Sequence, residues 1–306
     1  MKLNLHLLRI FYAVTENHNF SRAAEALFIS QPAVSKGVRE LEHQLGLPLI
    51  DRVRRAAQSE KGVRLTDNGQ ALREHARGIF ALERAAMDDI EARINLKRGR
   101  LVVGASTTVG GYNLPPYIAD FLQQHPLVDI QIVVGNTRYI SQLLIDCEID
   151  IALVEGSVNE PRIISQKWQD DPLSIVAPNE ALIAKQKKVS DRDLNEQIWV
   201  MREVGSGTRE ITDELLHASR VIPKKMIEIG SNEGIARAVA GGSGVAILPT
   251  IVVKDLIDLQ RIYVLSLSDS HQYTRPLSLL HIRERPLSPL AKQFIAFLNE
   301  ERKVEN

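Results

Sequence analysis

The residues near the amino terminus whose types could do chemistry lie on one face of a predicted helix whose first turn holds Pro32. This face carries an amide, a hydroxyl and two cations, from Gln31, Ser35, Lys36 and Arg39. Such groups match the donors and acceptors that base pairs present in the major groove of duplex DNA. A surface helix with a solvated polar face is the simpler interpretation, and the helix by itself leaves both open.

A second group of polar residues follows segments with the apolar character of buried strands. These residues occur in two separate halves of the chain: Ser106, Thr107, Thr108, Asn136, Thr137 and Glu155, then Ser206, Thr208, Arg209 and Asn232. Hydroxyls and helix amino termini at the carboxyl ends of strands form a natural anion site. Each residue could also serve only as a helix cap, but their agreement in both halves favours a ligand cleft.

Catalytic, metal and cofactor chemistry find no support in the sequence. The eight histidines show no HxxxH or HExxH spacing, and the single cysteine, Cys147, cannot build a metal cage or an internal disulfide. The glycine-rich stretches lack the GK[ST] ending of a phosphate-binding loop. Gly242-Ser243-Gly244 lies between a predicted helix and a predicted strand, the reverse of a nucleophile elbow. We expect no catalytic residue, no metal and no cofactor.

The composition is that of an ordinary globular chain with an uneven distribution of charge. The 306 residues carry no net charge, yet residues 1–100 hold 17 Lys and Arg against 12 Asp and Glu, and the rest hold 21 against 26. The excess positive charge lies where the polar helix lies, as a phosphate-binding module requires. No apolar run is long enough to cross a bilayer and no signal peptide is evident, so we expect a cytoplasmic protein with no membrane partner.

The polar helix is the second of two short helices predicted within residues 21–46. Ser21 is the expected cap of the first helix, and Phe28-Ile29-Ser30 forms the turn between them. Their inner faces are apolar: Ala23, Ala24 and Leu27 on the first helix, and Val34, Val38, Leu41 and Leu45 on the second. A preceding helix over residues 4–17 supplies a face for both to pack against, and Gly46 ends the second helix.

An extended pair and a long helix are expected next. Residues 47–50 and 63–65 are predicted to pair around a basic tip with Arg52, Arg54 and Arg55, which suit phosphates or the minor groove. Thr66-Asp67 then caps a helix that runs to about Leu96. Its apolar residues follow a coiled-coil-like spacing: Leu72, Ala76, Ile79, Ala86 and Ile90. So small an amino-terminal domain cannot bury this stripe, and we expect the helix to pair with a second copy.

From Arg98 onward, apolar segments alternate with amphipathic helices. Strands are expected near residues 101–105, 129–134, 149–154, 174–177, 198–201, 225–229 and 245–248, with helices between most of them. This alternation is typical of βαβ units and a parallel sheet. Two α/β lobes that meet at a cleft are the most economical architecture, and the last helix, Pro289–Glu301, would return to the first lobe.

Three segments carry a resemblance to a known family. FSRAAEAL, SQPAVSKGVRELEHQLG and RLTDNG are similar to the amino-terminal signature of LysR-type transcriptional regulators. The resemblance spans the chain in order and implies a mixed fold. An α winged helix-turn-helix domain over residues 1–66 and a linker (dimerisation) helix over 67–97 would precede a two-lobed α/β effector domain over 98–303, like the type 2 periplasmic binding proteins. Lobe I would comprise 98–169 and 268–303, and lobe II 170–267.

The resemblance also implies roles for individual residues. In this family the exposed start of the recognition helix contacts DNA, which implies Gln31, Pro32, Ser35 and Lys36, with Arg39 and Arg52 toward phosphates and Arg54 and Arg55 in the wing. The sequence departs from the family pattern in Ile50 for Phe, Lys36 for a common Arg, Cys147 for Gly, and a longer wing. Lysine keeps the positive charge but loses the bidentate geometry toward guanine.

The implied function is a non-enzymatic regulator whose binding to promoter DNA changes with a small anionic co-inducer bound in the inter-lobe cleft. The Thr107–Pro115 run, VGNT, LVEG and REVGSGTRE are similar to the branch that regulates CO2 fixation and sulfite or cysteine metabolism. The implied assembly is a homodimer that pairs into a homotetramer, with RNA polymerase as a further candidate partner. The alternatives are a solute-binding protein or an enzyme on the same scaffold, and a structural DNA-binding protein without a ligand.

Overall fold

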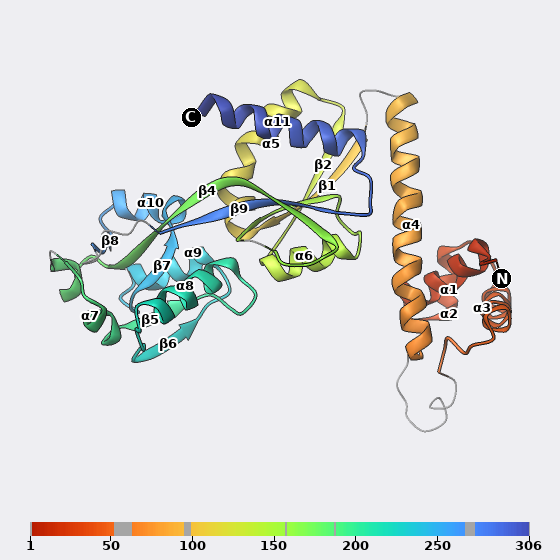
Figure 1. The fold of residues 1–306 in the computed structure, drawn as a ribbon, viewed down its shortest axis with the longest axis horizontal. Coiled ribbons are helices and arrows are strands. Elements are labelled where there is room, and N and C mark those ends of the chain that lie inside the picture. The colour runs from red at the N-terminus through yellow and green to blue at the C-terminus, as the bar shows by residue number, and fades with distance from the viewer. Residues whose placement is uncertain are drawn as a thin grey trace. The chain divides into compact units, whose positions relative to one another are not determined.

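The computed structural model describes most of the chain, which forms two compact units (Figure 1). The described residues are 2–51, 63–94, 99–156, 158–186, 188–266 and 273–305. The first unit comprises Met1–Ala86 and the second Met87–Asn306. Among the described residues, no helix combines the length and the apolar character needed to cross a membrane.

Three helices and the beginning of a fourth form the first unit. α1 spans Leu5–Asn17, α2 Phe20–Ala26, α3 Gln31–Leu45 and α4 Asp67–Ile94. One core joins them, and it contains Leu7, Leu8, Phe11 and Val14 of α1, Ala23 and Ala24 of α2, and Val34, Val38 and Leu41 of α3. The apolar stripes predicted from the sequence are thus the ones that pack together.

The expected cap of α2 is wrong by two residues. Asn19, not Ser21, precedes the helix, and its side-chain oxygen accepts hydrogen bonds from the backbone N–H groups of Ser21 and Arg22. Asparagine serves as well as serine because its short side chain reaches the same free amides. The turn that follows is where it was predicted, and its last residue, Ser30, caps α3 by accepting from the Ala33 N–H.

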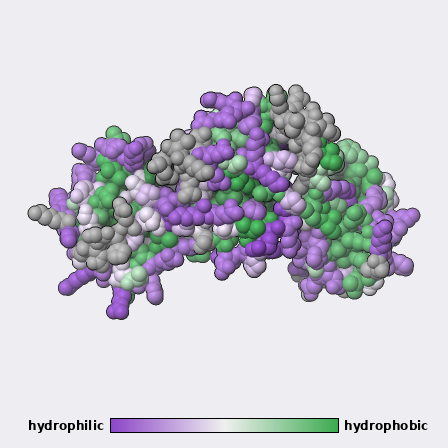
Figure 2. All heavy atoms as spheres, turned by 45° about the horizontal axis from the view of Figure 1, so that its top comes forward, coloured by the Kyte–Doolittle hydropathy of each residue, from purple (hydrophilic) through white to green (hydrophobic). Residues whose placement is uncertain are grey.

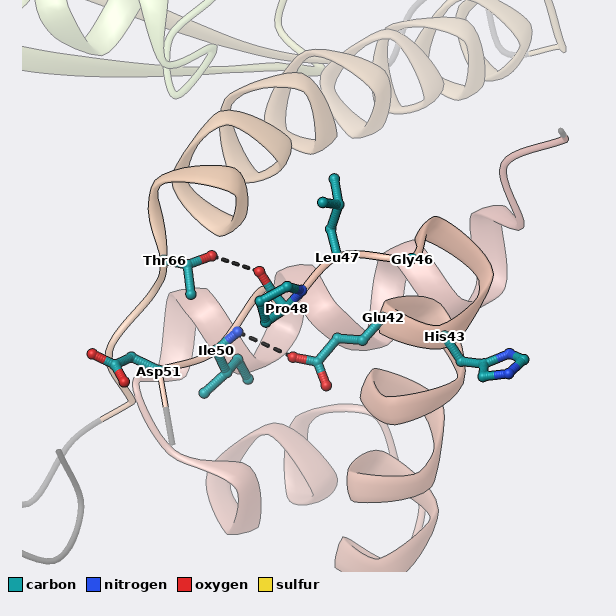
Figure 3. A pocket seen from close by; sticks show the side chains of 8 residues that line it. All are labelled: Glu42, His43, Gly46, Leu47, Pro48, Ile50, Asp51 and Thr66. Atoms are coloured by element: carbon teal, nitrogen blue, oxygen red, sulfur yellow. Dashed lines mark hydrogen bonds between the residues drawn. The ribbon is translucent and has the colours of Figure 1, made fainter. Parts of the chain in front are cut away.

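The segment after α3 is fixed to that helix by a partly buried carboxylate oxygen of Glu42 (Figure 3). Gly46 ends α3 with a left-handed φ of 69°, which glycine adopts without steric penalty. Glu42 Oε1 then accepts from the backbone N–H groups of Leu49 and Ile50, at 2.9 and 3.2 Å. Ile50 forms an antiparallel bridge with Leu65, so the base of the predicted extended pair is present. The predicted wing residues Arg52, Arg54 and Arg55 lie outside the described residues.

Thr66 links the same segment to α4. Its hydroxyl donates to the carbonyl oxygen of Pro48 at 2.7 Å, and its oxygen accepts from the Gly69 N–H at 3.0 Å. Thr66 therefore caps the long helix as predicted. A pocket of about 590 Å³ lies between the end of α3, this segment and Thr66.

α4 divides its apolar residues between two environments. Ala76 and Phe80 are buried in the core of the first unit, and Leu72 and Ile79 pack against it. The expectation that the amino-terminal domain cannot bury this stripe is therefore wrong for the first half of the helix. Further along α4, Leu82, Met87 and Ile90 are 45%, 55% and 52% exposed.

A seven-stranded mixed sheet runs through the second unit in the order β2-β1-β3-β9-β4-β7, with β8 paired to β4. The strands are β1 Gly99–Ser106, β2 Val128–Gly135, β3 Ile151–Glu155, β4 Ile163–Pro178, β7 Ala246–Pro249, β8 Ile262–Val264 and β9 Tyr273–Ile282. β1 is parallel to β2 and β3, whereas β9 is antiparallel to β3 and β4, and β4 to β7. The predicted parallel sheet is therefore correct for the first three strands and wrong for the rest of this sheet.

Helices cover both faces of the sheet in the first lobe (Figure 1). α5, Leu114–Gln124, and α11, Pro289–Glu305, lie on one face, and α6, Thr137–Ile145, lies on the other. Alternate residues of β1 divide between these faces, because Leu101, Val103 and Ala105 join the core of α5 and α11, while Val102 packs against that of α6. The last helix returns to the first lobe, as predicted.

The second lobe is built on the far end of β4. It contains α7 Asp191–Asn195, α8 Gly207–Ala218, α9 Asn232–Ala240 and α10 Thr250–Asp258, with the short parallel pair β5 Ile198–Met201 and β6 Lys225–Glu228. A parallel bridge between Trp199 and Val245 continues that pair. Short helices η2, Val109–Asn113, and η3, Leu182–Lys185, complete the unit, η2 being a π-helical turn.

β4 and β9 cross from one lobe to the other, and the sequence pattern did not predict either crossing. Ile163 and Trp168 of β4 belong to first-lobe cores, whereas Leu173 and Ile175 belong to a second-lobe core. Polar residues interrupt the apolar run of β4 between these two parts, so the sequence predicted a strand only over residues 174–177. The antiparallel pairing of β4 and β9 makes the two lobes parts of one sheet.

Replacing Phe294 tests whether α11 completes the core of the first lobe. Phe294 is fully buried and meets Phe121 of α5 edge-on, with ring centroids 5.0 Å apart. Phe294→Ala should lower the free energy of unfolding of the full-length chain by about 3–5 kcal/mol in urea denaturation, because it leaves a cavity. Lys292→Ala, on the exposed side of the same helix, should change it by less than about 0.5 kcal/mol. Equal effects would contradict this packing.

Candidate functional site

The exposed face of α3 brings the predicted polar side chains of the first unit together. Gln31 Nε2 donates to Ser35 Oγ at 2.9 Å, and Arg39 Nε donates to the carbonyl oxygen of Ser35 at 3.3 Å. Pro32 and Lys36 are exposed on the same helix. Because Gln31 and Ser35 are hydrogen-bonded to each other, their side chains would lose less conformational freedom on binding a partner. The face presents amide, hydroxyl and cationic groups in one arrangement.

Seven buried polar residues of the second unit form a connected group where the two lobes meet. We call them the inter-lobe cluster: Thr108, Thr137, Glu155, Asp171, Thr208, Asn232 and Arg275. None of the seven is more than 7% exposed. Burying so many polar groups is tolerated only because they pair with one another.

Arg275, on β9, is the centre of the cluster. Its Nε donates to Asp171 Oδ2 on β4 at 2.7 Å, and these two residues lie directly opposite each other in the antiparallel register. Nη1 donates to Thr208 Oγ1 in the second lobe at 2.8 Å, and Nη2 donates to Thr108 Oγ1 in the first lobe at 3.4 Å. Nη2 also lies 3.5 Å from Glu155 Oε1. One guanidinium therefore contacts hydroxyls of both lobes.

Asn232, the first residue of α9, also contacts threonine hydroxyls of both lobes. Its Nδ2 donates to Thr108 Oγ1 at 2.9 Å and to Thr208 Oγ1 at 3.3 Å. Each threonine oxygen thus accepts from both a guanidinium and an amide. Since a hydroxyl has one hydrogen to donate as well, Thr108 and Thr208 each keep that hydrogen for a further acceptor.

The backbone of the second lobe lies close to Glu155, which ends β3 in the first lobe. A Cβ added to Gly207 would lie 2.8 Å from Glu155 Cβ and 2.9 Å from its carbonyl oxygen, so only glycine fits at the start of α8. Thr137 donates to Glu155 Oε2 at 3.4 Å. Burial raises the pKa of Asp171 above that of an ordinary carboxyl group; the Arg275 guanidinium opposes this rise and the Glu155 carboxylate adds to it.

A second set of contacts joins the lobes beside the cluster. Arg202 is 1% exposed, donates to both oxygens of Glu203, and reaches Thr107 Oγ1 of the first lobe at 3.0 Å. Asn136 caps α6 by accepting from the Tyr139 N–H and also donates to Glu203 Oε1 at 3.1 Å. Burial acts to raise the pKa of Glu203, but the hydrogen bonds from Arg202 and Asn136 outweigh it and hold that pKa low.

The remaining predicted effector residues fall into two groups. Ser106 and Ser206 stand two positions before Thr108 and Thr208, and each Oγ is buried with no hydrogen-bond partner within the described part of the chain. Arg209 lies apart from the cluster. Its guanidinium contacts Asp213, Glu228 and the carbonyl oxygen of Arg202.

Four charged residues of this region were missing from the predicted site residues: Arg275, Asp171, Arg202 and Glu203. The opposite charges of Asp171 and Arg275 become a signal only when the β4–β9 register is known, because the two residues are far apart in the chain. Arg202 directly follows a buried strand in the same way as the predicted residues, and a search for polar residues at strand ends could have found it.

The cluster presents hydroxyl, amide and guanidinium groups, which are the groups that bind small polar molecules through hydrogen bonds. Among the described residues, no group of three or more His, Cys, Asp or Glu side chains is placed to hold a metal ion. The one cysteine of the chain, Cys147, lies in the turn after α6 with a left-handed φ of 58°. The arrangement therefore suits binding of a ligand through hydrogen bonds.

Two family models match the chain. Residues 5–70 match the bacterial regulatory helix-turn-helix protein model of the lysR family, and residues 95–303 match the LysR substrate binding domain. The regulatory domain of CcmR from Synechocystis PCC6803, solved in complex with 2-PG, superposes with a TM-score of 0.62 at 27% identity and covers 67% of this chain and 97% of that domain. The predicted fold class, a helix-turn-helix module followed by a two-lobed α/β effector domain, is confirmed.

Curated relatives agree with these matches. The HTH-type transcriptional regulator CysL of Bacillus subtilis is 36% identical over 276 residues, which is 90% of each chain. A probable RuBisCO transcriptional regulator of Phaeodactylum tricornutum is 31% identical over 315 residues, covering 100% of this chain and 98% of that protein. This chain therefore belongs to the LysR family of transcriptional regulators, DNA-binding proteins with an effector-binding domain and not enzymes.

Proposed function

We propose that this regulator binds promoter DNA through the exposed face of α3 and that a small anionic metabolite in the inter-lobe cluster modulates that binding. The observation that carries the ligand proposal is the buried set of hydroxyls, two from each lobe. Ser106 and Ser206 have Oγ atoms without partners, and Thr108 and Thr208 each keep a hydrogen to donate. Several buried hydroxyl donors from both lobes favour an anion.

The residues proposed for each partner follow the sequence analysis, with two changes. DNA is assigned Gln31, Pro32, Ser35, Lys36, Arg39 and the wing residues Arg52, Arg54 and Arg55; the effector is assigned Ser106, Thr107, Thr108, Asn136, Thr137, Glu155, Ser206, Thr208 and Asn232. Arg275 joins the effector group because of its contacts in the cluster. Arg209 is instead proposed to position Arg202, whose carbonyl oxygen it contacts.

Regulation follows from the way the cluster joins the lobes. A ligand that binds one relative position of the lobes more tightly than another shifts the population toward that position. A difference of about 1–3 kcal/mol is enough to change DNA affinity severalfold or more. The contacts that would change join Thr107, Asn136 and Glu155 of the first lobe to groups of the second lobe, among them Glu203 and Gly207.

The assembly is proposed to be a homodimer that pairs into a homotetramer, in the cytoplasm and in contact with RNA polymerase at the promoter. Support for self-association comes from α4, where Leu82, Met87 and Ile90 stay exposed beyond the buried half of the helix. Figure 2 shows hydrophobic surface on the first unit. The proposed domain limits remain 1–66, 67–97 and 98–303.

Ser35→Ala tests base recognition by α3. The variant should bind a duplex that the full-length protein selects from a random pool about ten- to a hundredfold more weakly, because it loses a contact to a base edge. Binding to unselected duplex should not change. Arg39→Ala should weaken binding to the selected and the unselected duplex alike and reduce the salt dependence of binding. Fluorescence anisotropy measures all four affinities, with Ser21→Ala on α2 as a matched control. Equal losses on both duplexes for Ser35→Ala would refute base recognition.

Thr108→Val tests the effector site. Valine keeps the shape of threonine but removes the hydroxyl, so the thermal shift of the full-length protein with small oxyanions, carboxylates and phosphorylated acids should fall to near zero. Thr274→Val, at an exposed position beside Arg275, should keep the full shift. A ligand-induced shift that survives in Thr108→Val would place the effector elsewhere.

Ile90→Glu tests self-association through α4. A glutamate in an apolar helix-to-helix contact would bury an unpaired charge, so sedimentation should show a smaller species than the wild type at the same concentration. Gln70→Glu changes charge on an exposed position of the same helix and should leave the assembly intact. An unchanged mass for Ile90→Glu would remove α4 from the interface.

A further inference from the structure

The inter-lobe cluster contains one cation for two carboxylates. Asp171 lies closest to Arg275, with its Oδ2 2.7 Å from Nε, whereas Glu155 Oε1 lies 3.5 Å from Nη2 and has no hydrogen-bond donor among the described residues. Glu155 is 1% exposed, so water does not readily replace the missing donor. A carboxylate oxygen accepts hydrogen bonds, and Glu155 Oε1, with only the distant Arg275 Nη2 beside it among the described residues, is free to accept one from a ligand.

The unpartnered oxygen lies next to the proposed donors. Arg275 Nη2 contacts both Glu155 Oε1 and Thr108 Oγ1, at 3.5 and 3.4 Å. A ligand oxygen that accepts the Thr108 hydroxyl hydrogen therefore approaches Glu155. Asn232 Oδ1, whose amide nitrogen contacts the same threonine oxygen, is a second buried acceptor without a partner. The cluster thus offers hydrogen-bond acceptors to its ligand as well as donors.

A site with both hydrogen-bond donors and acceptors distinguishes between anions of the same shape. A fully ionised oxyanion would place oxygen lone pairs against the Glu155 carboxylate, and the two groups would repel each other in a site of low dielectric. An oxyanion that retains one O–H group can donate that hydrogen to Glu155 while its other oxygens accept from the threonines and serines. A simple cation would satisfy Glu155 but would meet Arg275 and leave the hydroxyl donors without an acceptor.

We propose that the cluster selects small oxyanions that carry an O–H group, with Glu155 as the specificity-determining acceptor for that group. The inference rests on the proposed function of the cluster as the effector site and adds the chemical class of the effector: a hydrogen oxyanion, or an acid ester or hydroxy acid with an O–H beside its charged group.

Sulfate and hydrogen phosphate provide the test. In mildly alkaline buffer both ions carry two negative charges and have nearly the same size, but only hydrogen phosphate has a hydrogen to donate. Isothermal titration of the full-length protein should show phosphate binding about ten- to a hundredfold more tightly than sulfate, which is the effect of one hydrogen bond to a charged group. In Glu155→Gln, the new amide can donate to sulfate, so the preference should disappear or reverse.

Asp170→Asn supplies the matched control, because Asp170 is the exposed neighbour of Asp171 and pairs with Lys167. This variant removes the same charge and should keep the preference for phosphate. The role of Glu155 is overturned if the wild type binds sulfate as tightly as phosphate, or if Glu155→Gln still prefers phosphate. Either result would still support the anion site itself. Failure of both ions and of all small acids to bind the wild type overturns the proposed effector site and this inference with it.

Discussion

A buried guanidinium requires hydrogen-bonding or ionic partners in the protein, and in this chain those partners come from both lobes of the effector domain. Arg275 is 1% exposed, and its partners come from β3, β4, α8 and the turn after β1. Removing any one of them would leave charge or a polar atom without a partner in a site of low dielectric. The two crossing strands are consequently held in register where the lobes join, since Asp171 and Arg275 are opposite each other.

The same interaction underlies the ligand sensing that we propose for this domain. Two threonines, one from each lobe, accept hydrogen bonds from Arg275 and Asn232 and keep their own hydrogens for another acceptor. A ligand that takes those hydrogens contacts both lobes at once. Gly207 allows the start of α8 to approach Glu155 closely, so small changes in the position of the lobes alter many contacts together. Close packing converts such changes into a choice between discrete arrangements.

The first unit works by a different principle, because its functional groups must remain exposed. A compact apolar core under α1, α2 and α3 positions the exposed polar face of α3, and Gln31, Ser35 and Arg39 contact one another on that face. α4 belongs to this core for half of its length and then carries exposed apolar residues. A single helix therefore supports the module at one end and leaves an apolar surface at the other.

The sequence by itself determined the family, the helix α3 with its exposed polar face, the caps at Thr66 and Gly46, and most strands and helices, because these depend on local periodicity and on residues close in the chain. It also named most of the polar residues that meet between the lobes, since these follow strand ends. Only the structure decided that the sheet is mixed, that Asn19 caps α2 in place of Ser21, and that Arg275 and Asp171 pair where the lobes meet. Cross-strand register places residues 104 positions apart within 2.7 Å of each other, and no pattern within a short window of sequence contains that information.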